Sequence, residues 1–391
     1  MIRRIEIPIL AILFCVMGAS VARAQYVQEA LTNFAAAKIV IGQKDFTSLD
    51  CNQNGSNPAA NTLCDPEGAG ALGKKIFYVP DSDNARVLGF KKIPKKNGAS
   101  AKIVLGQSNF SSRNFGVSKT SFEFPSAVFV AGNKLLMSDF DNSRVLIWNK
   151  LPTKTNTPAD VVVGQSSFTS NVSATTQSGL DHPEIGLFVA GGKLFVADRD
   201  NNRVLIWNSI PTSNGAPANV VVGQPDFTSS GFATTQTGMG ETEGVWSDGT
   251  KLVVADFDNN RVLIWNTIPT TNGAPADVVV GQPDFTSFDN PEPPTAQSLD
   301  QPGGVASDGS RLFVEDSRNN RILVFSPFPT SNNPTASIVL GQPDFTHSDS
   351  NAGNSSPTAQ TLSFPFGMSI SGSQLLVDDE GNSRFLIFST N

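Results

Sequence analysis

Two short phrases recur six times along this chain, and they constrain its fold more than any other feature. The first is an apolar run that ends in Gly-Gln and is followed by Phe, with the glutamine at Gln43, Gln107, Gln165, Gln224, Gln282 and Gln342. The second is Asp-x-x-Asn-x-Arg, with the arginine at Arg86, Arg144, Arg203, Arg261, Arg321 and Arg384. Self-similarity at a period of about 60 residues predicts a repeat protein in which each repeat is one supersecondary unit.

One repeat is sufficient to predict four short strands. The runs 243–247, 251–256, 261–265 and 277–280 are rich in β-branched and aromatic residues. Turn-forming sequences separate them, beginning with the Asp-Gly dipeptide at 248–249, which favours a tight hairpin. Four short antiparallel strands that repeat around a circle form a propeller blade.

The sequence therefore predicts an all-β, six-bladed β-propeller that occupies residues 25–391 as a single domain. Its chain begins with a fourth strand at 38–42 and ends with a third strand at 384–388, so pairing these two would close the ring and remove two exposed strand edges. The blades are expected at about 66–107, 124–166, 183–225, 243–283, 302–343, and 365–391 completed by 37–43.

The first 24 residues have the pattern of a secretory signal peptide. Two arginines precede the apolar stretch 7–17, and Ala22-Arg23-Ala24 is a small-x-small cleavage sequence that predicts cleavage near Ala24-Gln25. The apolar stretch is too short for a membrane span, so no membrane insertion is expected. The prediction is a secreted or periplasmic protein.

Charge and cysteine content narrow the classes of partner. The formal net charge of −7 becomes −9 when the signal peptide, with three arginines and one glutamate, is removed. An acidic chain without a basic cluster is not expected to bind nucleic acid, because phosphate contacts supply most of that affinity. Export leaves Cys51 and Cys64, which we expect to form a disulfide across a polar loop. The alternatives are two free thiols or metal ligands.

The second phrase, continued as Asp-x-x-Asn-x-Arg-Val-Leu-x-Trp, resembles the NHL repeat of six-bladed propellers, and the resemblance covers essentially the whole mature chain. The period is longer here, and the Gly-Gln-Pro-Asp-Phe phrase is an addition. The histidine that often precedes the arginine is replaced by Ala85, Ser143, Asn202, Asn260, Asn320 and Ser383. The resemblance implies a module that binds protein, RNA or another ligand. A minority of such propellers resemble lyases and lactone hydrolases that use a metal in the central channel.

Features that every blade shares are expected to serve folding. The aspartate of the second phrase could form a cation site, but we expect it to accept turn N–H groups and to face the arginine of its own blade. These aspartates are Asp81, Asp139, Asp198, Asp256, Asp316 and Asp379. Trp148, Trp207 and Trp265 share one register position and are expected in the core between blades.

Features that differ between blades are where function is expected, above all at the start of each innermost strand beside the channel. Glu67, Glu184 and Glu243 share one position there, and oxygen-rich sets of this kind suit calcium or magnesium. The alternative is an ordinary wet channel lining. Trp246 could stack a ligand ring or belong to the core. The candidate ligand-binding residues are Asp65, Glu67, His182, Glu184, Glu243, Trp246 and Gln301.

The long polar loops between blades also differ from one another, and loops of this length are usually functional or disordered. The favoured prediction is a binding or scaffold module for a protein or glycan ligand, acting through the loop face and the channel mouth. One alternative is a divalent-metal-dependent lactonase or esterase-like hydrolase with a carboxylate site in the channel. Another is a glycan-binding propeller, with Phe115 and Phe288 as exposed aromatics. No catalytic residue is assigned, because His182 and His347 are the only histidines.

Overall fold

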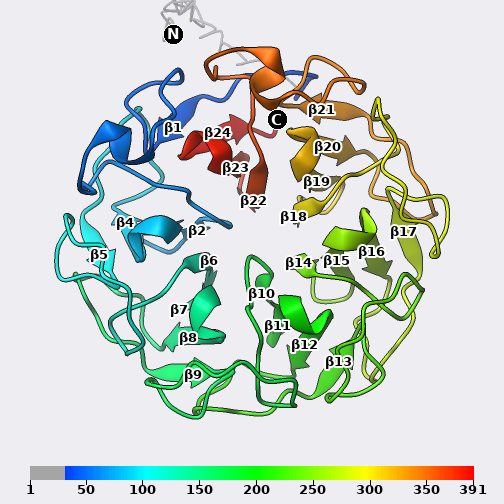
Figure 1. Ribbon diagram of the computed structural model, residues 1–391, viewed down its shortest axis with the longest axis horizontal. Helices are drawn as coiled ribbons and strands as arrows, with labels where there is room; N and C mark the ends of the chain where they lie inside the picture. Colours follow the sequence, from blue (N-terminus) through cyan, green and yellow to red (C-terminus); the bar gives the residue numbers. More distant parts are fainter. Residues whose placement is uncertain (1–30) are drawn as a thin grey trace, which may run out of the picture.

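The computed structural model describes residues 31–391, so the predicted signal peptide and its cleavage site lie outside the described residues. Six four-stranded antiparallel sheets surround a central channel, which confirms the six-bladed β-propeller (Figure 1). In each blade the chain runs from the channel outward. The innermost strands are β2 (Ala71–Leu72), β6 (Pro125–Ala131), β10 (Leu187–Ala190), β14 (Thr242–Ser247), β18 (Pro302–Ser307) and β22 (Pro365–Ser371).

The second and third strands of each blade are joined by a turn of 3₁₀-helix that contains the Asp-x-x-Asn phrase. The second strands are β3 (Phe77–Asp81), β7 (Lys134–Asp139), β11 (Lys193–Asp198), β15 (Leu252–Asp256), β19 (Leu312–Asp316) and β23 (Gln374–Asp379). The 3₁₀ turns are η2 (Ser82–Asn84), η3 (Phe140–Asn142), η4 (Arg199–Asn201), η5 (Phe257–Asn259), η6 (Ser317–Asn319) and η8 (Glu380–Asn382). The third strands are β4 (Arg86–Phe90), β8 (Arg144–Trp148), β12 (Arg203–Trp207), β16 (Arg261–Trp265), β20 (Arg321–Phe325) and β24 (Arg384–Ser389).

The outermost strands are three residues long, and one of them closes the ring. They are β5 (Ile103–Leu105), β9 (Val161–Val163), β13 (Val220–Val222), β17 (Val278–Val280), β21 (Ile338–Leu340) and β1 (Ile39–Ile41). Strand β1 pairs with β24 in the register Ile39 with Ile387 and Ile41 with Phe385, as expected from the two ends of the repeat pattern. Two further 3₁₀ turns, η1 (Cys51–Asn54) and η7 (Ser350–Gly353), lie in loops between blades.

The core lies between neighbouring blades. The second and third strands are buried along almost their whole length, and their side chains pack against the next sheet of the ring. Trp265, for example, packs with Val222 and Val245 of two different blades. The indole N–H groups of Trp148, Trp207 and Trp265 each donate to a backbone carbonyl oxygen, at 2.9, 2.9 and 3.0 Å. These contacts confirm the expected place of the three tryptophans.

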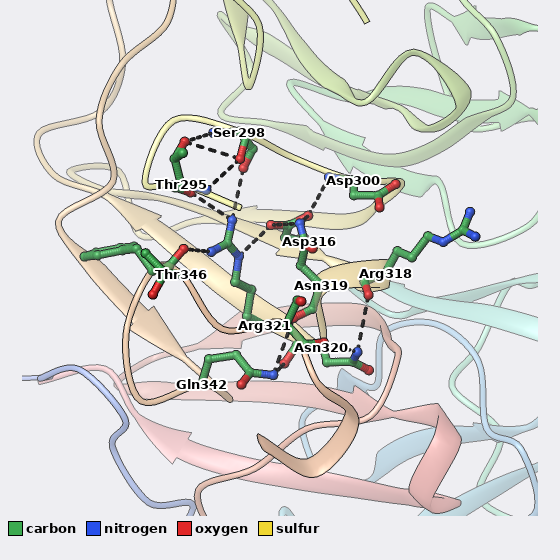
Figure 2. A network of polar contacts seen from close by, with 12 residues as sticks. Thr295, Ser298, Asp300, Asp316, Arg318, Asn319, Asn320, Arg321, Gln342 and Thr346 are labelled. Carbon is green, nitrogen blue, oxygen red and sulfur yellow. Dashed lines mark hydrogen bonds and ion pairs between the residues drawn. The ribbon is translucent and has the colours of Figure 1, made fainter. Parts of the chain in front are cut away.

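The two repeated phrases bind each other, and the fifth blade shows how (Figure 2). Arg321 is fully buried and its Nε donates to Asp316 Oδ2 at 2.6 Å. Its Nη2 donates to the carbonyl oxygens of Thr295 and Ser298 in the loop before the blade, at 2.9 and 3.2 Å. Its Nη1 donates to the carbonyl oxygen of Phe345 in the loop after the blade. Each such arginine therefore fastens two consecutive loops to its blade.

The glutamine of the first phrase completes the network. Gln342 Nε2 donates to the carbonyl oxygen of Asn320 at 3.2 Å and to that of Asp349 at 2.8 Å, which ties the end of the outermost strand to the 3₁₀ turn. Asp316 accepts from the arginine of its own blade, as expected. Within residues 31–391, the N–H groups of the turn do not donate to Asp316, contrary to the expectation. The backbone N–H that donates to Asp316 Oδ1 is instead that of Asp300 in the preceding loop, at 2.6 Å.

Candidate functional site

The mouth of the channel on the loop face is surrounded by the residues that follow the repeated aspartates. This position starts each 3₁₀ turn beside the innermost strands, and unlike the aspartate it differs from blade to blade. Its occupants are Ser82, Phe140, Arg199, Phe257, Ser317 and Glu380. Ser82 and Ser317 bond to the innermost strand of the next blade, through the carbonyl oxygens of Pro125 and Pro365 at 3.0 and 2.7 Å. The other four supply charge and aromatic surface.

Arg199 gathers the carboxylates of one side of the mouth, in what we call the Arg199 group. Its Nε lies 2.9 Å from Glu184 Oε2 and 2.7 Å from Glu243 Oε1, and its Nη2 lies 2.6 Å from Glu241 Oε2. Glu243 is fully buried, and burial followed by repulsion from Glu184 raises its pKa well above the usual range although Arg199 opposes the shift. Arg199 Nη1 also lies 2.8 Å from Asp200 Oδ1, so one guanidinium holds four carboxyl groups from two blades.

Four more carboxyl groups lie at the mouth beside Glu184, and we call Asp65, Glu67, Asp83 and Glu380 the acidic group. None of them forms an ion pair with a cationic side chain within residues 31–391. Burial raises the pKa of Glu380 to about 8 and that of Asp83 to about 6, with repulsion from Asp65 the next cause in both. The positive charge of Arg113 acts against the rise in the pKa of Asp83. Burial and the Glu184 carboxylate raise the pKa of Glu67 well above its usual range. The Oε2 atom of Glu67 is buried without a hydrogen-bond partner among the described residues.

Two more acidic side chains approach this group from behind the innermost strands. Glu315 and Asp378 each precede a repeated aspartate, and both are fully buried. Glu315 Oε2 accepts the backbone N–H of Gly304 at 2.9 Å, and a Cβ on Gly304 would lie 2.1 Å from that oxygen. Burial raises the pKa of both side chains well above the usual range, and Glu380 adds repulsion at Asp378. Buried carboxyl groups with raised pKa values are therefore concentrated on the fifth, sixth and first blades.

An apolar cluster joins side chains of three blades, and we call it the plug. It consists of Ile185, Phe257 and Phe366, which come from the third, fourth and sixth blades and are 5–7% exposed. Phe257 and Phe366 meet edge to face with ring centroids 5.8 Å apart. A Cβ on Gly303 would lie 2.9 Å from the Phe366 ring, so the fifth blade also packs against the plug.

His182 forms a separate pair of contacts on the second and third blades. Its Nδ1 lies 2.8 Å from Asp181 Oδ1 and 3.0 Å from Asp200 Oδ2, and its ring packs 4.9 Å from that of Phe140. The hydrogen bond with Asp200 is the main cause that raises the pKa of His182 to about 9. The imidazole is therefore charged at neutral pH and is poorly suited to act as a base. His347 is exposed and binds Asp344 at 2.7 Å.

The predicted metal ligands Glu67, Glu184 and Glu243 lie near one another, but Arg199 forms ion pairs with only two of them. Arg199 already holds Glu184 and Glu243, and a guanidinium between two carboxylates supplies the charge that a metal would bring. Among the described residues, two other groups place ligand atoms within 4.8 Å of one another. One contains Cys64, which is bonded to Cys51 and confirms the predicted disulfide. The other is His182 with its two aspartates, where the charged imidazole occupies the cation's place.

Six of the seven predicted binding residues lie around the mouth, and Trp246 does not. Gln301 is at the mouth, where its backbone N–H donates to Asn260 Oδ1 at 2.9 Å. Trp246 pairs with Val253 near the hairpin end of β14, whereas Thr242 pairs with Asp256 at the loop face. At about 3.3 Å per residue, Trp246 lies about 13 Å along the strand from that face. Trp246 therefore lies toward the other end of the channel from the six other candidate residues.

Sequence reasoning missed Arg199 and Glu380, and with them Glu241 and Asp83. The sequence did contain a sign of the first two. The residue after each repeated aspartate differs from blade to blade, as the residues at the strand starts do. The loop face also carries exposed apolar side chains in four successive loops, at Phe115, Val172, Phe232 and Phe288. No helix within residues 31–391 is long and apolar enough to cross a membrane.

Neither a family model nor a curated protein matches this chain, so the NHL resemblance stays a prediction. Among solved structures, hydrazine synthase of Kuenenia stuttgartiensis is similar at 11% identity and a TM-score of 0.47, over 94% of this chain and 98% of that one. The nidogen/laminin complex is similar at 12% identity and 0.39, over 70% and 83%. The computationally designed Ika8 protein is similar at 9% identity and 0.40, over 91% and 100%. The fold assignment rests on the strand pairing itself.

Proposed function

We propose that this protein is an exported, NHL-type binding module that docks a protein partner on its loop face. A positively charged side chain of that partner sits against the acidic group at the channel mouth. The observation that carries the proposal is the acidic group: Asp65, Glu67, Asp83 and Glu380 lie at the mouth with no ion-pairing cation among residues 31–391.

The free-energy cost of ionising these buried carboxyl groups favours a cationic ligand. Burying a carboxylate without a partner is costly, and the group avoids that cost by taking up a proton, which is why the pKa of Glu380 reaches about 8. A lysine or arginine side chain nearby would instead stabilise the ionised form and lower these pKa values. Binding would therefore release protons, and it would strengthen as the pH rises.

Apolar side chains on the same face favour a protein as the source of that cation. Phe115, Phe232 and Phe288 are 57–60% exposed, and each lies in a different loop between blades. Aromatic side chains are enriched in protein interfaces, where they supply much of the binding energy. Export is supported by the Cys51–Cys64 disulfide and by the signal-peptide pattern of residues 1–24.

Thermal unfolding of the mature chain, 25–391, tests the proposal. Acetyl-lysine amide and acetyl-arginine amide should raise the melting temperature at constant ionic strength, more at pH 8.5 than at pH 6, and acetyl-norleucine amide should not. Glu67→Gln should remove the rise, whereas Glu292→Gln, an exposed loop glutamate, should keep it. Equal responses to all three amides would overturn the proposal. A response to calcium or magnesium alone, lost in Glu67→Gln, would replace the basic side chain with a metal ion.

A hydrolase is the second candidate, and one observation favours it. The pKa of Glu67 is raised by burial and by the neighbouring Glu184, whose carboxylate forms an ion pair with Arg199, and pairs of carboxyl groups in unlike environments serve as acid and base in hydrolases. Lactone and ester substrates, assayed with and without calcium, should then be cleaved by the wild-type chain. Glu67→Gln should lower kcat by at least about 100-fold if Glu67 is the general acid.

A further inference from the structure

The channel holds a second cavity at the end opposite the loops. Its volume is about 250 Å³, and the innermost strands of all six blades line it. Its wall includes Trp246, Phe188 and Phe129 on one side and Leu72 and Ile370 on the other. No lining residue carries a titratable side chain, in contrast to the charged mouth on the loop face.

Aromatic rings form a continuous arc on one wall of this cavity. The Phe129 and Phe188 centroids lie 4.7 Å apart, and Phe188 lies 6.4 Å from Trp246. Phe328 supports Trp246 from behind at 6.0 Å. Trp246 is 9% exposed, so its position is fixed by packing on most of its surface. Pre-positioned rings of this kind offer flat contact area at a small cost in conformational entropy.

The cavity also offers polar backbone groups. Each innermost strand pairs with a second strand on one side only, and its other edge faces the channel. Such an edge leaves backbone N–H and C=O groups available for hydrogen bonds. The hydroxyl-bearing residues Ser307, Ser369 and Ser371 lie in the lining, and the first two already donate to the carbonyl oxygens of Arg311 and Gly70. The inner end is bounded by Ile185, a member of the plug, which separates the cavity from the acidic group.

We infer that this cavity binds a small uncharged molecule with one or two rings and one polar group. A dry cavity of about 150 Å³ accommodates benzene, so 250 Å³ suits a molecule of about two fused rings. A charged ligand would lose its hydration without gaining an ionic partner from this lining. The aromatic arc would contact the ring face, and a strand edge would bond the polar group. This site is independent of the binding function proposed for the loop face.

Calorimetric titration with 2-naphthol, and with 2-naphthalenesulfonate as its charged analogue, tests the inference on the mature chain. The naphthol should bind saturably at one site, and the sulfonate at least about tenfold more weakly. Ser371→Trp places a bulky side chain in the lining and should weaken naphthol binding at least about tenfold. Ser373→Trp is the matched control, because Ser373 is exposed and does not line the cavity.

Fluorescence supplies a second readout that survives if Ser371→Trp fails to fold. Naphthol should quench part of the tryptophan emission by contact with Trp246. That part should be lost in Trp246→Phe and kept in Trp265→Phe, whose ring lies between blades. Glu67→Gln should leave naphthol binding unchanged, which separates this site from the loop-face proposal. Absence of saturable binding, equal binding of the sulfonate, or unchanged binding in both Ser371→Trp and Trp246→Phe would overturn the inference.

Discussion

Arg384 donates a hydrogen bond of 2.6 Å from Nη1 to the carbonyl oxygen of Phe46, a residue 338 positions earlier in the chain. Every other blade makes the same bond to a phenylalanine 24 positions later, as Arg144 does to Phe168. The ring is thus closed by the same polar contact that joins each blade to the next. Ring closure requires no additional type of contact, because the N-terminal segment contains the first phrase and the last blade contains the second.

Removing the N-terminal strand should therefore open the ring. A chain that starts at Thr47 lacks Val40 and Ile41, which are fully buried and contribute about 2–3 kcal/mol each, and it exposes the edge of β24. We expect a lower melting temperature and self-association, measured by light scattering coupled to size exclusion. A chain that starts at Leu31 is the control. A monomer of normal stability from the shorter chain would show that β1 does not close the ring.

The buried ion pair of a single blade should be essential to stability. Asp256→Ala leaves Arg261 buried without its carboxylate and removes the acceptor of the Gly240 N–H, so we expect a loss of about 3–5 kcal/mol in the free energy of unfolding. Urea denaturation measures the loss, with and without calcium. Asp258→Ala, two positions away and exposed, should change it little. A change below about 0.5 kcal/mol in Asp256→Ala would contradict the structural role.

The Cys51–Cys64 disulfide should contribute stability through the short loop that it closes. The two cysteines are 13 positions apart, and loop entropy predicts a cost of about 3 kcal/mol for the double variant Cys51→Ser, Cys64→Ser. Intact mass of the wild-type mature protein should be two hydrogens below that of the reduced form. A mass equal to that of the reduced form would show that the two cysteines are not bonded.

The sixth blade offers a matched position for a second disulfide. Ser350 and Ser363 each lie 299 positions after the corresponding cysteine, and their Oγ atoms lie 2.8 Å apart. The 3₁₀ turns η1 and η7 have the same backbone conformation, with φ of 53° at Asn52 and 55° at Asn351. The double variant Ser350→Cys, Ser363→Cys should therefore oxidise without strain, and its mass should show four hydrogens lost. Two free thiols under oxidising conditions would show that the two loops differ.

The pH dependence of stability should report on Glu380. Its pKa is about 8 in the folded protein and near 4.5 when unfolded, so the folded state binds the extra proton between these values. Stability from this group is complete below pH 4.5 and is lost as the pH rises to 8. Glu380→Gln should match wild type at pH 5 and exceed it by ~1–3 kcal/mol at pH 9 in urea denaturation. A difference that does not vary with pH would refute the assignment, and Glu292→Gln serves as control.

The repeated phrases were sufficient to predict the blades because each phrase performs the same packing task six times. The Asp–Arg pairs and the inter-blade tryptophans followed from that repetition. The mouth was predicted only in part: aligning the strand starts found Glu67, Glu184 and Glu243, but not Arg199, which contacts the last two from a neighbouring turn. Such contacts depend on how adjacent blades are placed, and a repeat pattern does not specify side-chain distances across blades.

Trp246 shows the same limit in another way. The sequence placed it correctly on an innermost strand, and its position four residues after Thr242 puts it beside the far cavity. The buried acids Glu315 and Asp378 were also missed, because they belong to second strands, and Glu315 fits only where Gly304 lacks a side chain. The space that a glycine leaves can be recognised only when the segment that fills it is known.

The arginine contacts also define where this chain tolerates added sequence. Each loop is held at a phenylalanine carbonyl by one blade and at a second carbonyl by the next, as at Phe110 and Ser118. These two points are 8 positions apart in that loop and 13 apart from Phe46 to Ala59, yet the arginine contacts are the same. Foreign peptides inserted between such points would be anchored at both ends. The protein thus provides six adjacent positions on one face for the display of grafted recognition sequences.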